Sequence, residues 1–323
     1  MTPGRSLTML TIVALTGCGM PETPDRIWVT VPENAAITAV AESLETRGVI
    51  GSGDALISYL RMVRKTDSIK PGMYDLLPRT PIAKVVHTLV AGVAPVDSIT
   101  IPERATLAEI AVVFQNSLGR PVDRFLTAAR APHLRARVGT RGETLEGYLF
   151  PTSYYVRTTA SVSEILEQMI DEFEANWSRA WNARLDTLGF SRDELVTLAS
   201  IISGEMAHEE DRALVSSVYH NRLDGNMRLQ ADPTVIYALG ERRRLRNRDY
   251  QIASPYNTYR IAGLPPHPIG QPSRESIVAA LYPDSSDYLY FVATAEGRHL
   301  FSRSYREHLA TIRAVRTRSI SRR

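Results

Sequence analysis

The sequence predicts an α+β protein, in which a small N-terminal module precedes a larger mixed domain. Short runs of alternating apolar residues, typical of strands, stand between longer runs with the helical period of 3.6 residues. The first runs come in the order strand, helix, helix, strand, helix, which suits a small α+β module. The chain has 323 residues, 44% hydrophobic and 23% charged, enough for one large folded domain or two ordinary ones.

The predicted elements of the first module lie within residues 27–100. Ile27, Val29 and Val31 alternate as in a half-buried strand. A helical apolar pattern then begins at Ile37, and Gly48 ends it. The remaining elements are a helix over 54–66, a strand within 69–76, a helix over 81–92 and a strand within 96–103.

The larger domain, residues 101–323, is predicted to be mostly helical. One long helix is expected over 161–181, because its apolar residues recur at every fourth position. A β-hairpin is expected over 287–302, with its turn near Glu296 and Gly297. The other predicted elements are helices over 105–118, 121–130, 191–206, 212–223, 274–283 and 304–315, an aromatic segment over 144–156 and an ordered Pro- and Gly-rich loop over 254–273.

The first 18 residues have the features of a bacterial export signal. Arg5 precedes an apolar run, Leu7–Leu15, that is well short of the roughly 20 residues needed to span a bilayer. The Leu-Thr-Gly-Cys sequence ending at Cys18 resembles a lipobox, and Cys18 is the only cysteine in the chain. The resemblance implies cleavage before Cys18 and lipidation of its thiol; a plain signal peptide and an uncleaved anchor are the alternatives. The mature protein is expected to be exported, with residues 19–26 as a tether.

The charge balance gives no support for a nucleic-acid-binding protein. The formal net charge is only +3, and no zinc-finger, helix-turn-helix or RNP pattern occurs. A single cysteine also excludes an internal disulfide and a thiolate metal site.

One glutamate stands on the apolar side of a predicted helix. Ser191 and Glu194 form a capping box that starts the helix over 191–206. Glu205 follows Ile201 by four residues and Ile202 by three, so it shares their face. Burial disfavours the charged form and should raise the pKa of Glu205, as a general acid near neutral pH requires. By spacing alone, a structural buried carboxylate remains the alternative.

Three more acids, Glu209, Glu210 and Asp211, precede the helix over 212–223. Acidic side chains at a helix N-terminus complement the helix dipole. We therefore expect them to face solvent there, although Glu209 follows Glu205 by four residues and could share its face.

Five motifs in a fixed order carry a family resemblance. They are TLASIISGEM, VSSVYHNRL, MRLQADPTVIYALG, SPYNTYRIAGLPPHPI and YLYFVATAEGRHLFS. Together with the upstream LEGYLFPTSYY and the Ile-Pro-Glu strand at 101–103, this series resembles the endolytic murein transglycosylase (YceG-like) family. The resemblance covers about residues 27–310. It implies a LysM-like module over 27–100 and a catalytic domain over 101–323.

The resemblance implies an enzyme that cleaves peptidoglycan glycan strands internally, with Glu205 as the catalytic acid. Glu205 would protonate the glycosidic oxygen between MurNAc and GlcNAc, and its carboxylate would then deprotonate the MurNAc C6 hydroxyl, giving a 1,6-anhydro end. No water is consumed, so a second carboxylate is not required. No metal or cofactor is implied. The residues expected to bind the substrate are Glu146, Tyr148, Asn221, Arg222, Gln230, Asp232, Tyr256, Asn257, Thr258, Tyr259 and His299, with Gln230 and Asp232 in a strand and loop.

The chain departs from the family pattern at three positions. Ser203, two residues before Glu205, stands where many members carry a further acid. Thr152 and His267 replace a common acid and a common glycine. We expect these departures to affect substrate detail more than the reaction itself.

Three other functions compete with this interpretation. A peptidoglycan-binding lipoprotein without catalysis would not need Glu205 on the apolar face. A hydrolytic muramidase would need a second carboxylate, which Asp232 or Glu146 could supply. A purely structural envelope protein fits the dense motifs poorly. The expected partners are glycan strands, the membrane through the lipid anchor and cell-wall synthases, and the expected location is the membrane surface facing the periplasm or cell wall.

Overall fold

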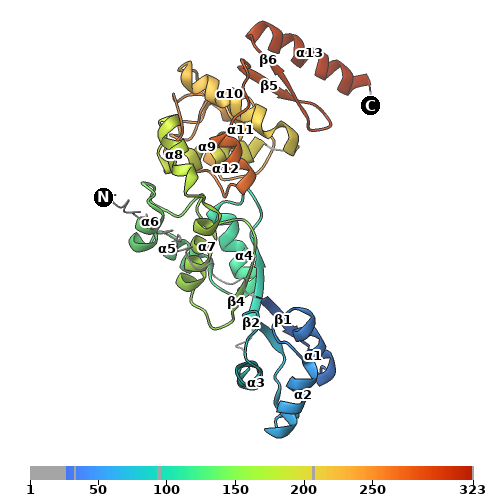
Figure 1. The fold of residues 1–323 in the computed structure, drawn as a ribbon. Helices are drawn as coiled ribbons and strands as arrows, with labels where there is room; N and C mark the ends of the chain where they lie inside the picture. The colour runs from blue at the N-terminus through green and yellow to red at the C-terminus, as the bar shows by residue number, and fades with distance from the viewer. Residues whose placement is uncertain (1–26, 33, 93–95, 206–207, 322–323) are drawn as a thin grey trace, which may run out of the picture. The chain divides into compact units, whose positions relative to one another are not determined.

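The structure is a computed structural model, and it describes residues 27–32, 34–92, 96–205 and 208–321 (Figure 1). The predicted signal sequence with Cys18 and the tether over 19–26 lie outside the described residues. The chain divides into two units between Pro95 and Val96, and each has its own hydrophobic core. Both units combine helices with two-stranded sheets, which confirms the predicted α+β class.

The first unit has the predicted order of elements. Strand β1 (Ile27–Val31) pairs antiparallel with β2 (Gly72–Leu76). Between them lie α1 (Ile37–Thr46), α2 (Gly53–Met62) and the short η1 (Thr66–Ser68), and α3 (Ile82–Ala91) follows. Every strand and α-helix of the unit contributes fully buried side chains to the core, and Val49 between α1 and α2 is also fully buried: Val29, Leu44, Val49, Leu56, Leu60, Tyr74, Val85 and Leu89.

The boundary between the units differs from the predicted one at residue 100. Strand β3 (Val96–Thr100) pairs antiparallel with β4 (Ser153–Arg157), and Ile99 packs in the core of the second unit. Thr100 of β3 pairs with Ser153 of β4, which is 53 positions further along the sequence, and the hydroxyls of these two residues are hydrogen-bonded. This long-range pairing assigns the strand to the second unit.

The second unit is mainly helical. Its helices are α4 (Leu107–Leu118), α5 (Val122–Ala128), α6 (Pro132–Val138), α7 (Val162–Asn176), α8 (Ala180–Leu188), α9 (Arg192–Glu205), α10 (Arg212–Asp224), α11 (Asp232–Leu239), α12 (Arg274–Leu281) and α13 (Tyr305–Ser321). Short η2 (Glu209–Asp211) and η3 (Asp249–Gln251) turns and the hairpin β5 (Tyr290–Ala293) and β6 (His299–Ser302) complete it. The hairpin turn contains Gly297 with φ 82°, as the Glu296-Gly297 signal predicts.

Helix α9 lies at the centre of its neighbours. It packs against α8, α10, α11 and α12, which are grouped around it in Figure 1. Every residue from Leu195 to Ser203 is buried, so the helix is covered on all sides rather than along one apolar stripe. The predicted capping box is confirmed: the Ser191 backbone N–H donates to Glu194 over 2.8 Å, and the Glu194 N–H donates to Ser191 Oγ over 3.2 Å.

Two predicted elements are wrong in detail. The single helix over 161–181 is broken, because Trp177 is extended (φ −90°, ψ 111°) and α7 ends at Asn176. The aromatic residues at every fourth position still contact one another, since Trp177 stacks on Phe173 and meets Trp181 edge-on. Asp232 starts helix α11 rather than a strand and loop, because Pro233 in the first turn favours a helix start.

None of the helices in the described part of the chain has the length and apolar character needed to cross a membrane.

Candidate active site

Glu205 is the last residue of α9, and its carboxyl faces α10. The Tyr219 hydroxyl donates to Glu205 Oε1 over 2.8 Å, and Tyr219 itself is fully buried. Glu205 is partly buried. Burial raises its pKa to about 7, with the negative charge of Asp232 acting in the same direction, while the Tyr219 hydrogen bond and the Arg222 charge oppose the rise. At neutral pH the carboxyl can therefore both give and take a proton.

The end of α9 is held against the start of α11 by a glycine. A Cβ atom at Gly204 would stand 2.5 Å from the Cβ of Pro233, closer than side chains can approach. Gly204 and Pro233 are the immediate neighbours of Glu205 and Asp232. The close contact between Gly204 and Pro233 therefore fixes the spacing of Glu205 and Asp232.

Asp232 is oriented by two tyrosines from the segment after α11. The Tyr259 hydroxyl donates to Asp232 Oδ1 over 2.6 Å, and the Tyr250 hydroxyl donates to Oδ2 over 3.4 Å. The two rings are 4.6 Å apart and tilted. The two tyrosine hydroxyls thus hold the Asp232 carboxylate in place, and its negative charge acts on Glu205.

Arg222 and Asn221, at the end of α10, mainly hold backbone. The Arg222 guanidinium donates to the carbonyls of Leu289 (2.7 Å) and Leu229 (2.6 Å) and is buried, and burial lowers its pKa. Asn221 donates to the carbonyls of Ser286 and Tyr288, each over 2.9 Å. These contacts tie α10 to the segment that enters the hairpin.

The loop predicted over 254–273 is ordered by buried polar side chains. Asn257 donates to the carbonyls of Tyr250 and Ile252, and the Thr258 hydroxyl accepts from the Ala231 N–H over 2.9 Å. Both side chains are fully buried, so their contacts place Tyr259 and the start of α11. Gln230 is exposed beside them with φ 49°, in the left-handed region.

Tyr256 is partly buried and contacts two other rings. Its hydroxyl is 2.6 Å from His267 Nε2, and its ring lies 4.8 Å from Tyr237. Burial raises the pKa of Tyr256 to about 12. The histidine at the departure from the family pattern therefore has a packing role beside Tyr256.

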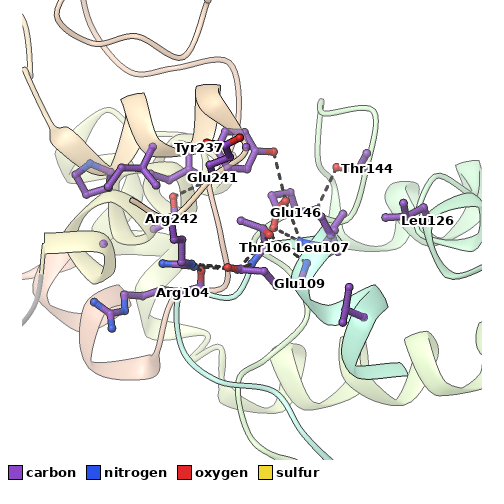
Figure 2. A pocket seen from close by; sticks show the side chains of 18 of the residues that line it. Arg104, Thr106, Leu107, Glu109, Leu126, Thr144, Glu146, Tyr237, Glu241 and Arg242 are labelled. Atoms are coloured by element: carbon purple, nitrogen blue, oxygen red, sulfur yellow. Dashed lines mark hydrogen bonds and ion pairs between the residues drawn. The ribbon is translucent and has the colours of Figure 1, made fainter. Parts of the chain in front are cut away.

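Glu146 lies apart from Glu205, and its carboxylate contacts the first residue of α4. Its carboxylate accepts from the Leu107 N–H over 3.2 Å, from Gln271 Nε2 over 2.8 Å and from the Tyr237 hydroxyl over 3.3 Å. Figure 2 shows Tyr237 and Leu107 approaching Glu146. Burial raises the pKa of Glu146 to about 8, although the hydrogen bonds from Leu107 and Tyr237 oppose the rise.

Glu146 lines a cavity of about 630 Å³ that does not include Glu205. The cavity is bordered by α4, α5, α9 and α11 and includes Gly204 and Pro233. This concave site therefore lies next to Glu205 along the chain rather than around its carboxyl.

Tyr148 and His299 have structural contacts. Tyr148 is fully buried, and its hydroxyl donates to Asp193 Oδ1 over 2.6 Å. His299 is buried, and its backbone N–H donates to Asp211 Oδ2 over 2.7 Å. The prediction that Asp211 faces solvent is wrong, because Asp211 is buried and anchors the hairpin, whereas Glu209 and Glu210 are exposed.

Ser203 belongs to a buried network on another side of α9. Its hydroxyl lies 2.7 Å from both Glu103 Oε1 and Ser276 Oγ, and buried Arg212 pairs with Glu103 over 3.2 Å. Burial would raise the pKa of Glu103, but the serine hydroxyls and Arg212 together lower it. Two residues turn a helix by about 200°, so Ser203 and Glu205 point in nearly opposite directions.

Sequence reasoning missed Tyr219, Tyr250 and Glu103. Tyr219 and Tyr250 orient the two acids, and Glu103 anchors α9. Tyr219 lies inside the VSSVYHNRL motif, which was a signal that it mattered. Its contact with Glu205 depends on how α10 crosses α9, which residue spacing does not specify.

Comparison with known proteins finds one family model and several relatives. The model of the YceG-like family matches residues 29–314. A Bacillus subtilis (strain 168) protein named endolytic murein transglycosylase is 30% identical over 297 residues, covering 87% of this chain and 82% of that protein. A protein of the same name from Streptococcus pneumoniae serotype 2 (strain D39 / NCTC 7466) is 29% identical over 315 residues, and the match covers 57% of its length.

A solved structure has a similar fold. The 2.6 Å crystal structure of a putative yceG-like protein from Listeria monocytogenes aligns with a TM-score of 0.62 and 32% identity, over 88% of this chain and 98% of that one.

Proposed function

The chain belongs to the YceG-like family, and we propose that it is a lytic transglycosylase that cuts peptidoglycan glycan strands internally. The observation that carries this proposal is Glu205, a partly buried carboxyl with a pKa raised to about 7 at the end of the central helix. The relatives named endolytic murein transglycosylase support the same reaction class.

Glu205 would perform both proton transfers. The protonated carboxyl gives its proton to the glycosidic oxygen as the bond from MurNAc C1 to that oxygen breaks, and GlcNAc leaves with a free hydroxyl. An oxocarbenium-like centre develops at C1. The Glu205 carboxylate then takes the proton of the C6 hydroxyl as O6 bonds to C1, which yields the 1,6-anhydro end and restores the acid. A pKa near the working pH suits a group that must donate and then accept.

Asp232 and Tyr219 would tune this acid in opposite directions. The charge of Asp232 favours the protonated form of Glu205, and the Tyr219 hydrogen bond favours the ionised form. Tyr219 would thus stabilise the carboxylate that exists between the two proton transfers. Asp232, held by Tyr259 and Tyr250, would keep Glu205 protonated before the first.

Eight of the eleven predicted substrate residues separate into two groups under this proposal. Gln230, Asp232, Tyr256 and Tyr259 retain exposed surface and are proposed to contact the sugars. The polar side chains whose bonds are already made within the protein are proposed to position them: Asn221, Arg222, Asn257 and Thr258.

A hydrolase is the second candidate, and the proximity of Asp232 to Glu205 favours it over a non-catalytic binding protein. Asp232 could activate a water molecule as the second carboxylate. Digestion of isolated peptidoglycan by the full chain, Glu205→Gln and Asp232→Asn separates these functions. We expect anhydro-MurNAc ends and rapid shortening of strands from the parent and almost no cleavage by Glu205→Gln. Reducing ends from the parent would support the hydrolase instead.

We propose that the first unit is a LysM-like module that holds glycan strands. Its order β1, α1, α2, β2 agrees with the module expected from the family resemblance. The lipidated Cys18 is proposed to keep the exported chain on the membrane, facing the cell wall and its synthases. Cys18→Ser should release the protein from the membrane fraction; retention there would contradict the lipid anchor.

A further inference from the structure

The cavity beside Glu146 lies one residue away from both acids of the proposed active site. Gly204, which precedes Glu205, and Pro233, which follows Asp232, both line it. Neighbouring Cα atoms are about 3.8 Å apart, and Gly204 and Pro233 are packed as closely as their side chains allow. A short chain attached to a sugar at Glu205 therefore needs little length to enter the cavity.

The walls of the cavity are largely apolar, although polar and charged residues also line it. The aliphatic side chains come from four segments: Leu107, Ala108 and Val112 of α4, Leu126 of α5, Pro233 and Ile236 of α11, and Ile269. Tyr237 is the one aromatic side chain among the lining residues. A bare sugar carries hydroxyls on every side, and aliphatic walls would leave many of them without hydrogen-bond partners.

The polar groups of the cavity suit a ligand with amides and carboxylates. Arg104, Arg130 and Arg242 line it together with Glu109, Glu146 and Glu241. Guanidinium groups bind carboxylates with paired hydrogen bonds, and carboxylate side chains accept hydrogen bonds from amides. Figure 2 shows Arg242 beside Glu109, its partner, and the Tyr237 hydroxyl pointing toward Glu146. The volume of about 630 Å³ lies within the usual range for small-molecule sites.

We propose that this cavity binds the lactyl-peptide that peptidoglycan carries on its MurNAc residues. The methyl and methylene groups of the peptide would contact the aliphatic walls, and its carboxylates would meet the arginines. The enzyme would thereby prefer peptide-bearing strands to strands without peptides. This inference rests on the proposed function, because it assumes that MurNAc is bound at Glu205.

A tryptophan at the cavity tests the proposal by binding alone. Ala108 is exposed and lines the cavity, so Ala108→Trp should fill it without disturbing the core. Gln115→Trp, at an exposed position of the same helix outside the cavity, is the matched control. A lactyl-tripeptide of the peptidoglycan stem, titrated by NMR into the full chain, should bind the parent and Gln115→Trp. Affinity for Ala108→Trp should be at least tenfold weaker.

Failure of the peptide to bind the parent at millimolar concentration would overturn the proposal, as would equal binding to Ala108→Trp. Because this titration needs no catalysis, it stands apart from the proposed function. Peptide binding without anhydro products would contradict the transglycosylase and leave the cavity site in place. Anhydro products without peptide binding would support the transglycosylase and contradict the cavity site.

Kinetics give a second readout. The ratio of kcat/KM for peptide-bearing strands to that for amidase-stripped strands should be about tenfold or more in the parent and in Gln115→Trp. It should fall toward one in Ala108→Trp. A parent ratio of one would contradict the preference.

Discussion

The chemistry of the site depends on a balance of forces around one carboxyl. Burial and the charge of Asp232 raise the pKa of Glu205, and Tyr219 and Arg222 restrain the rise, with a result near 7. The spacing of Glu205 from Ile201 and Ile202 was enough to predict its burial and the direction of the shift. The tyrosines that orient the two acids could not be predicted, because their contacts bring together segments that are distant in the sequence.

The pH dependence of cleavage should follow this balance. The protonated fraction of Glu205 falls as pH rises through its pKa, so kcat/KM should decline tenfold per pH unit above about pH 7. Asp232→Asn removes a charge that raises the pKa and should move this decline to lower pH. Tyr219→Phe removes a bond that lowers the pKa and should move it to higher pH. Shifts in the same direction for both variants would show that the assignment is wrong.

The same pKa predicts a pH-dependent stability difference. The folded-state pKa of Glu205 lies above the unfolded value, so the folded state binds the proton more tightly and gains relative stability at low pH. That gain is complete below about pH 4 and is lost as pH rises through 7. Glu205→Gln has no such loss, so its Tm relative to the parent should increase from pH 5 to pH 8. A Tm difference that does not change with pH would count against a buried acid.

At the scale of elements, α9 and α11 together set the geometry of the site. The Ser191 and Glu194 capping box and the apolar run of α9 were readable from the sequence, because caps and burial have local signatures. The start of α11 at Asp232 was missed, although Pro233 signalled it, and α6 was not foreseen. Helix α7 ends before Trp177, and from there ring contacts rather than helical hydrogen bonds connect the aromatic residues spaced four apart.

Gly204→Ala should separate α9 from α11. The added methyl would meet Pro233 at 2.5 Å, so the last turn of α9 must move and carry Glu205 with it. We expect kcat/KM to fall about 10²-fold, since a displacement near 1 Å at a reacting group can cost that much. Gly51→Ala is the control, because its Cβ would have no neighbour within 4 Å. Unchanged kcat/KM for Gly204→Ala would mean that this contact does not set the position of Glu205.

At the scale of the whole molecule, the chain combines two units with separate cores. Alternating and helical patterns predicted the elements of the first unit in their correct order. The boundary was misplaced because β3 looks like any other strand until its partner is known, and β4 lies far along the sequence. Local patterns therefore predict elements better than they predict which unit an element joins.

Separate cores predict separate unfolding transitions. Leu56 is fully buried in the core of the first unit, so Leu56→Ala should destabilise that unit by about 2–5 kcal/mol. Scanning calorimetry of the full chain should show one transition lowered and the other unchanged. Ile110→Ala, in the core of the second unit, should lower only the unfolding transition of the second unit. A single transition that both variants shift equally would contradict independent cores.

The most direct test of the central claim is digestion of peptidoglycan in water enriched in oxygen-18, with the ends of the products read by mass spectrometry. If Glu205 transfers the proton of the C6 hydroxyl, the new MurNAc ends are anhydro, carry no heavy oxygen and are absent with Glu205→Gln. New reducing ends that carry oxygen-18 would show that water attacks C1, and the chain would then be a hydrolase.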